Sequence, residues 1–128
     1  MGSEMCIRDR IGLGSGTFGN ESEVAVGQEP VDLELGDIDG DGDLDLTTAN
    51  GASGDCSICL NNGNGVFAFH AVIPVLESPL RTSLGDLNGD GHLDLCVSFL
   101  EVPEIWTFEN DGTGVFTDFV VHLSLIHI

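Results

Sequence analysis

The sequence repeats itself at an offset of 49 positions, and this period constrains the fold more than any other feature. Asp37 and Asp86 are 49 positions apart, and so are Gly63 and Gly112, which lie in two similar glycine-rich turns. A third copy of that turn begins at Gly14, another 49 positions before Gly63. Periods of this length are typical of solenoids and propellers, in which each unit packs on its neighbours. The chain is therefore expected to consist of similar stacked units.

Each unit contains four segments with the pattern of β-strands, and no segment has a helical period. The segment 31–36 alternates apolar and polar residues, and 44–50 is rich in leucine and β-branched residues. Two further strand-like segments, 55–61 and 66–73, flank a Gly-x-Gly turn. Four strands per unit at this period predict a propeller blade. We expect an all-β fold, a partial β-propeller with two near-complete four-stranded antiparallel blades and the last part of a preceding one.

The two ends of the chain are related to each other at the level of DNA. Residues 5–10 can be encoded by ATGTGTATAAGAGACAG, and the reverse complement of this string encodes residues 123–128. We interpret 1–10 and 123–128 as translated adapter sequence, which makes the chain an internal piece of a longer protein, and we exclude them from fold reasoning. The other predicted units are the end of a preceding blade (11–29), a blade with an acidic loop at 37–45 (30–78) and a blade with an acidic loop at 86–94 (79–122).

The two acidic loops crowd carboxylates at alternate positions, where like charges repel one another unless a cation lies among them. Calcium takes oxygen ligands, and a short loop can supply several of them from alternate positions. In the first loop (37–45) the predicted ligands are the side chains of Asp37, Asp39, Asp41 and Asp45 and the backbone carbonyl of Asp43. In the second loop (86–94) they are the side chains of Asp86, Asn88, Asp90 and Asp94 and the carbonyl of His92. The sequence therefore predicts two calcium sites.

These loops differ from an EF-hand, which begins with the same spacing but requires a glutamate at position 12 and flanking helices. Position 12 is Thr48 in the first loop and Val97 in the second, and both lie in predicted strands. Alternatives are an acidic turn without metal and a dockerin-like or thrombospondin-like calcium repeat, which the period of 49 disfavours. We expect two independent sites, with tighter binding in the first loop because it presents four ligand carboxylates against three and an amide.

The stretches "DIDGDGDLDL…NNGNGVF" and "DLNGDGHLDL…NDGTGVF" resemble the FG-GAP and VCBS repeats of calcium-binding β-propellers, an architecture also found in integrin α-subunit heads. The resemblance covers nearly all of 11–122. It implies a ring of similar blades in a secreted or surface-displayed protein, with adjacent blades of the same parent chain as partners. It does not imply a single activity, because such propellers serve adhesion, carbohydrate binding and as appendages of secreted enzymes.

Composition and motifs narrow the function. Residues 11–122 contain twenty acidic residues and one basic residue, Arg81, and such a surface repels nucleic acid and anionic membranes. No stretch is apolar and long enough to span a membrane, and no nucleophile–base pair or phosphate loop is recognisable. We expect a non-enzymatic, extracellular or cell-surface module for binding, adhesion or display, with a carbohydrate or protein ligand. The alternative is the non-catalytic propeller portion of a secreted enzyme, such as a polysaccharide-degrading one.

Cys56 and Cys59 have a CxxC spacing, which raises zinc or redox chemistry. Within a strand, however, positions i and i+3 face opposite ways and lie about 10 Å apart, too far for a disulfide. We interpret both as small buried or half-buried hydrophobes, and a bridge to Cys96 stays open. Trp106 takes the place of Ser57 and is interpreted as a half-buried strand residue, with an exposed sugar-stacking ring as the alternative.

An incomplete ring must leave the outer faces of its terminal blades open. The apolar strand residues expected to be exposed on these faces are Leu33, Leu46, Leu95 and Phe119. Because repeat arrays generally need three or more units for stability, the chain alone is expected to be marginally stable or self-associating.

Overall fold

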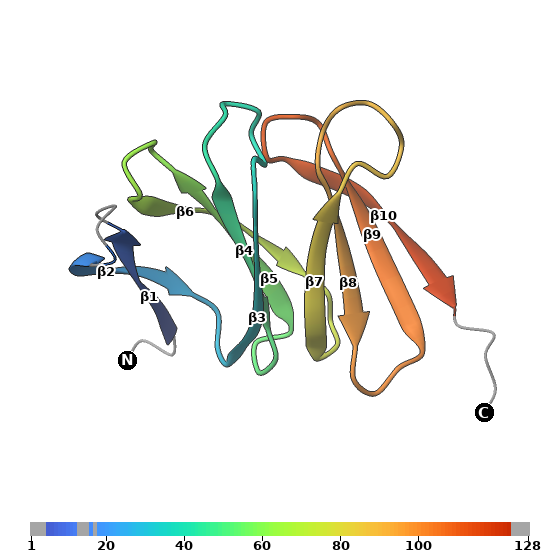
Figure 1. Ribbon diagram of the computed structural model, residues 1–128. Coiled ribbons are helices and arrows are strands. Elements are labelled where there is room, and N and C mark those ends of the chain that lie inside the picture. The colour runs from blue at the N-terminus through green and yellow to red at the C-terminus, as the bar shows by residue number, and fades with distance from the viewer. Residues whose placement is uncertain (1–4, 13–15, 17, 124–128) are drawn as a thin grey trace.

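The computed structural model describes residues 5–12, 16 and 18–123, and its regular structure is entirely β-strand (Figure 1). A hairpin is formed by β1 (Met5–Gly12) and β2 (Phe18–Val26). The first blade consists of β3 (Pro30–Gly36), β4 (Asp45–Asn50), β5 (Asp55–Asn61) and β6 (Phe67–Pro74). The second blade consists of β7 (Pro79–Gly85), β8 (Asp94–Phe99), β9 (Glu104–Asn110) and β10 (Phe116–Leu123). Among the described residues there is no helix that could cross a membrane.

Both blades are antiparallel meanders in which each strand pairs with the next along the chain. The first strands of the two blades begin at Pro30 and Pro79, and the second strands at Asp45 and Asp94, each pair 49 positions apart. The predicted all-β class, with four-stranded antiparallel sheets as partial propeller blades, is confirmed. Figure 1 shows the hairpin and the two blades side by side, with both acidic loops at the same end.

The main core lies between the two blades, where one face of each sheet is apolar. Its buried members include Ile58 and Val75 from the first blade and Leu95, Val97 and Phe108 from the second. A smaller core joins the hairpin to the opposite face of the first blade, through Val24, Val26, Leu46 and Cys59. The first blade is therefore covered on one face by the second blade and in part on the other face by the hairpin, which leaves side chains of β3 such as Leu33 exposed.

The segment interpreted as adapter, 5–10, belongs to β1 in the structure, and it pairs with β2 with Met5 opposite Val26. The hairpin occupies the positions that β5 and β6 occupy in the first blade, since 55 minus 49 is 6. The origin of this segment and the unit boundaries stay predictions.

The predicted exposure of the open faces is correct for two residues and wrong for two. Leu33 and Phe119 are 46% and 53% exposed, although Phe119 stacks on Trp106 on the face turned toward the first blade rather than on an outer face. Leu46 and Leu95, by contrast, are buried. Leu46 is covered by the hairpin, and Leu95 lies between the blades because this face of the second blade points toward the first.

The cysteines and Trp106 have structural roles. Cys56 packs in the core between the blades and Cys59 in the core under the hairpin, so the two thiols face opposite ways. Burial raises the pKa of Cys56 to about 12 and that of Cys59 to about 11, and Cys96 is also a free thiol. Trp106 is half-buried and stacks on Phe119 with ring centroids 4.7 Å apart, which confirms its interpretation as a packed strand residue.

Candidate metal centre

The first loop brings its carboxylates together at the junction of β3 and β4. One side-chain oxygen from each of four residues lies within 4.8 Å of the others: Asp37, Asp39, Asp41 and Asp45. Asp45 is fully buried at the start of β4, whereas Asp41 is exposed to solvent. The cluster therefore has a rigid base in the sheet and an open outer side.

The backbone of the first loop curls around Asp37. The carboxylate of Asp37 accepts hydrogen bonds from the N–H groups of Gly40 at 2.9 Å, Asp41 at 3.1 Å and Gly42 at 2.9 Å. Gly40 and Gly42 have φ of 79° and 91°, in the left-handed region that side chains with a Cβ rarely adopt. The two glycines thus allow the tight curl that brings the alternate aspartates to one side.

Asp45 anchors the other end of the same loop. Its Oδ2 accepts a hydrogen bond from the N–H of Ile38 at 2.8 Å and a longer one from the N–H of Asp39 at 3.3 Å. Its Oδ1 accepts a hydrogen bond from the N–H of Asn61, the last residue of β5, at 2.9 Å. Because these donors are fixed in or near the sheet, the buried carboxylate is held in one orientation.

The second loop repeats this frame. Asp86 accepts hydrogen bonds from the N–H groups of Gly89 at 2.8 Å and Gly91 at 2.9 Å, and Asp94 accepts one from the N–H of Leu87 at 2.9 Å. One oxygen from each of three carboxylates lies within 4.8 Å of the others: Asp86, Asp90 and Asp94. The fourth predicted side-chain ligand, Asn88, uses its Oδ1 to accept a hydrogen bond from the N–H of Asp90, as Asp39 does from Asp41.

The two residues predicted to contribute only a carbonyl, Asp43 and His92, have side chains that lie outside the carboxylate clusters. Both side chains approach the Gly-x-Gly turn of their own blade. A Cβ on Gly63 would lie 3.0 Å from Asp43 Oδ2, and a Cβ on Gly112 would lie 2.5 Å from the His92 ring. The absence of a Cβ at these glycines lets each turn pack against its loop.

Electrostatics differ between the loops. The pKa of Asp39 is raised to about 6, first by desolvation and then by its contact with Asp41 and the charge of Asp45. The pKa of Asp86 is instead lowered, chiefly by the N–H of Gly91 and other backbone donors. Arg81, the one basic residue of 11–122, pairs with Asp32 at 3.8 Å. The raised pKa of Asp39 indicates that full ionisation of the carboxylates in the first loop is unfavourable.

Two asparagines that the sequence analysis did not single out connect the loops to the Gly-x-Gly turns. Asn61 donates from Nδ2 to the carbonyl of Leu44 at 3.0 Å, and its Oδ1 accepts from the N–H groups of Gly63 at 2.9 Å and Gly65 at 3.1 Å. Asn110 does the same in the second blade. The signal was present in the sequence, since both start an Asn-x-Gly-x-Gly motif and are 49 positions apart.

The donor set fits a hard divalent cation. All the converging side-chain atoms are oxygens, which suit calcium or magnesium rather than a soft metal. Four carboxylates within 4.8 Å, one with a raised pKa, form a site whose charge a divalent cation would offset. The loops thus provide converging oxygen atoms and a concentration of negative charge, both of which favour a bound cation.

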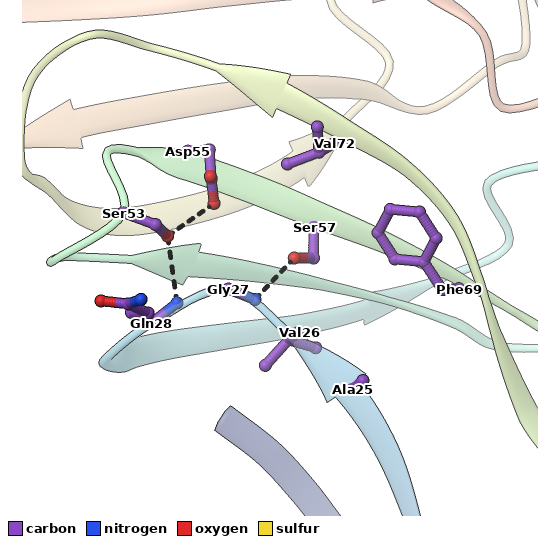
Figure 2. Close-up of a pocket in the computed structure, with 9 residues that line it drawn as sticks. All are labelled: Ala25, Val26, Gly27, Gln28, Ser53, Asp55, Ser57, Phe69 and Val72. Atoms are coloured by element: carbon purple, nitrogen blue, oxygen red, sulfur yellow. Dashed lines mark hydrogen bonds between the residues drawn. The ribbon is translucent and has the colours of Figure 1, made fainter. Parts of the chain in front are cut away.

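A separate pocket of about 460 Å³ lies between residues 25–28 and the first blade (Figure 2). Polar groups line part of this pocket: Ser57 Oγ accepts a hydrogen bond from the N–H of Gly27 at 3.1 Å. Ser53 Oγ accepts one from the N–H of Gln28 and donates to Asp55 Oδ1 at 2.9 Å. Among the described residues that line this pocket there is no histidine that could act as a base for its serines.

Comparison with known proteins supports the repeat. Residues 37–97 match the family model of the FG-GAP-like repeat. The match begins at Asp37, the first predicted ligand of the first loop, and ends in β8, so it includes both acidic loops. No curated protein matches the chain. The resemblance to FG-GAP repeats is therefore confirmed.

Proposed function

Because the chain carries an FG-GAP-like repeat, we propose that it is a calcium-binding propeller module of a secreted or cell-surface protein, used for binding, adhesion or display. The observation that carries the proposal is the convergence of carboxylate oxygens within 4.8 Å in both acidic loops. The same loop frame occurs twice, 49 positions apart. A solvated acidic turn that binds no ion would not require this repetition.

The proposed ion contributes structure rather than catalysis. It would neutralise the first loop through Asp37, Asp39, Asp41 and Asp45, with the Asp43 carbonyl as a further ligand, and the second loop through the equivalent set. Calcium sites of extracellular modules bind with a Kd of about 10⁻⁴–10⁻³ M, which suits two partly exposed loops. FG-GAP-like repeats typically occur in extracellular proteins, which supports the same location here.

The partners that we propose follow from the open faces and the charge. Adjacent blades of the same parent chain would cover the apolar side chains that remain exposed on the blade faces, such as Leu33. A carbohydrate or protein ligand fits the module better than nucleic acid, because a surface with a formal charge of −19 repels phosphates.

The second candidate function is the non-catalytic propeller portion of a secreted enzyme. The FG-GAP-like repeat is a structural, non-catalytic type of module, so any catalysis would lie in another domain of the parent protein. The sequences that flank this chain in its parent gene distinguish the two candidates. A neighbouring domain with its own carboxylate pair or triad would favour the enzyme.

Thermal melting tests the metal assignment. Calcium that binds only the folded chain raises stability by RT ln(1+[L]/Kd), so the melting temperature should rise from excess chelator to millimolar calcium. The matched control is a chain with Asp37→Ala and Asp86→Ala, which should lose most of this rise. Equal melting of the native chain in chelator and in calcium would show that the assignment is wrong.

A further inference from the structure

Asn110, the last residue of β9, is buried between the two acidic loops. It is 3% exposed, and its backbone N–H donates a hydrogen bond to Asp94 Oδ1 at 2.9 Å. Its Nδ2 donates to two carbonyls, those of Leu93 at 2.9 Å and Ile38 at 2.7 Å. Ile38 belongs to the first loop and Leu93 to the second, so one amide group binds the backbone of both loops.

The remaining atoms of this side chain are also engaged. Oδ1 of Asn110 accepts hydrogen bonds from the N–H groups of Gly112 at 2.9 Å and Gly114 at 3.0 Å. An asparagine side chain has two N–H donors and one acceptor oxygen, and all of them have partners here. A fully satisfied buried amide has one orientation, so it can transmit a shift of one loop to the other.

Ile38 lies between two predicted ligands, Asp37 and Asp39. Its N–H is held by Asp45 of its own loop, and its carbonyl is held by Asn110 of the following blade. The peptide group that precedes Asp39 is therefore oriented from outside the first blade. Packing supports this contact, because Ile38 is 1% exposed and a Cβ on Gly40 would lie 3.5 Å from the carbonyl of Gly112.

We propose that Asn110 is a positioning residue that couples the two metal sites. A cation in the second loop fixes Asp94 and, through Asn110, the Ile38 carbonyl, which preorganises the first loop. Because coupling between two binding sites is reciprocal, a cation in the first loop strengthens the second site by the same factor. This inference rests on the proposed calcium function, and it replaces the independent sites expected from the sequence.

Asn61 provides an internal control. It has the same place in the first blade and the same bonds to its own loop, through Asp45 and Leu44. In the described part of the chain, the side-chain hydrogen bonds of Asn61 go to Leu44, Gly63 and Gly65, all within its own blade. A change at Asn61 should therefore affect the first loop only, whereas a change at Asn110 should affect both.

The coupling can be measured by calcium titration calorimetry of the full chain. Asp86→Ala with Asp90→Ala disables the second loop, and we expect the Kd of the remaining site to rise about fivefold, at the lower end of typical coupling. Asp37→Ala with Asp41→Ala should weaken the second site by a similar factor. Affinities that do not change when the other loop is disabled would overturn the coupling, even though calcium binding itself is intact.

The role of Asn110 is tested in the same backgrounds. With the second loop disabled, Asn110→Ser should weaken the first site, because it removes the hydrogen bond to the carbonyl of Ile38. If Asn110 acted on the second loop alone, the first site would be unchanged. With the first loop disabled, Asn61→Ser should leave the second site unchanged. An unaltered first-site Kd in a folded Asn110→Ser chain would overturn the positioning role.

If Asn110→Ser does not fold, the loop-disabled chains with native Asn110 still decide whether the sites are coupled. Circular dichroism in excess chelator establishes folding for each variant. A native chain that binds no calcium at all would contradict the proposed function rather than the coupling, so the two failures are distinguishable.

Discussion

Ile38 and Leu87 occupy the same position in two loops with nearly the same hydrogen-bond frame, yet Ile38 is 1% exposed and Leu87 is 56% exposed. The N–H of each donates to the buried aspartate of its own loop. The difference is the neighbour: the second blade packs on Ile38, whereas the described residues include no third blade that could cover Leu87. The internal frame of an acidic loop is thus local, whereas its burial depends on the blade that follows.

A second contrast separates the faces that the two blades turn toward the preceding unit. In the second blade, Trp106 fills this face and stacks on Phe119 at an interplanar angle of 11°. In the first blade the same place is taken by Ser57, which accepts a hydrogen bond from Asn50 at 3.0 Å and lines the pocket in Figure 2. One repeat position therefore supports either aromatic packing or a polar network.

The largest expected effect is the difference in stability between alanine substitutions at the equivalent residues Ile38 and Leu87. Ile38→Ala should lower the free energy of unfolding by about 3 kcal/mol, because it leaves a cavity between the blades. Leu87→Ala should change it by less than about 0.5 kcal/mol, since that side chain is mostly in solvent. Urea unfolding in saturating calcium measures both. Similar losses at the two positions would contradict the burial contrast.

The next effect concerns the calcium contribution of each loop. At calcium one hundred times the Kd, one site stabilises the fold by about 2.7 kcal/mol. Asp37→Ala should remove a larger calcium-dependent contribution than Asp86→Ala, because the first loop presents four converging carboxylates and the second presents three. The measured quantity is the difference in unfolding free energy between calcium and chelator. A larger loss in Asp86→Ala would reverse the predicted order of affinity.

Much of the fold and of the acidic loops could be predicted from the sequence because the patterns that determine them are local. The alternation of apolar residues predicts the strands, and the spacing of aspartates and glycines predicts the loops that gather Asp37 and Asp86 with their neighbours. The hydrogen bond from Asn110 to Ile38 could not be predicted, because it joins residues 72 positions apart and depends on how two sheets pack. The burial of Leu95 was missed for the same reason, since alternation does not say which face meets the neighbouring blade.

A smaller effect is expected from pH. Asp39 has a pKa raised to about 6, whereas its counterpart in the second loop, Asn88, does not titrate. Below about pH 6 a proton competes with calcium for Asp39, so the affinity of the first site should fall by up to about tenfold from pH 7 to pH 5. The second site should fall less. Calorimetry on chains with one loop disabled measures each site.

The raised pKa of Asp39 also predicts how the stability of the chain in chelator depends on pH. Between the ordinary pKa of 3.8 and about 6, folded Asp39 holds more proton than unfolded Asp39, so folding is favoured as pH falls through this range. In chelator, Asp39→Asn should remove this gain. A chelated native chain that is no more stable at pH 5 than at pH 7 would contradict the raised pKa.

The smallest effect on folding is expected at the open face of β3, where we expect a larger effect on association between copies of the chain. Leu33 and Leu35 are 46% and 49% exposed there, while their counterparts in the second blade, Thr82 and Leu84, are buried and half-buried. Leu33→Lys with Leu35→Lys should change the free energy of unfolding by no more than about 0.5 kcal/mol, because these side chains are far from fully buried. It should lower the mass measured by light scattering, since charges on an open sheet face oppose contact between copies.

The matched control is Leu76→Lys with Leu100→Lys, which adds the same charge at apolar side chains that are 84% and 68% exposed but lie outside the strands. If the control lowers the mass equally, net charge rather than the open face of β3 governs association, and the contrast between the two blade faces has no consequence in solution.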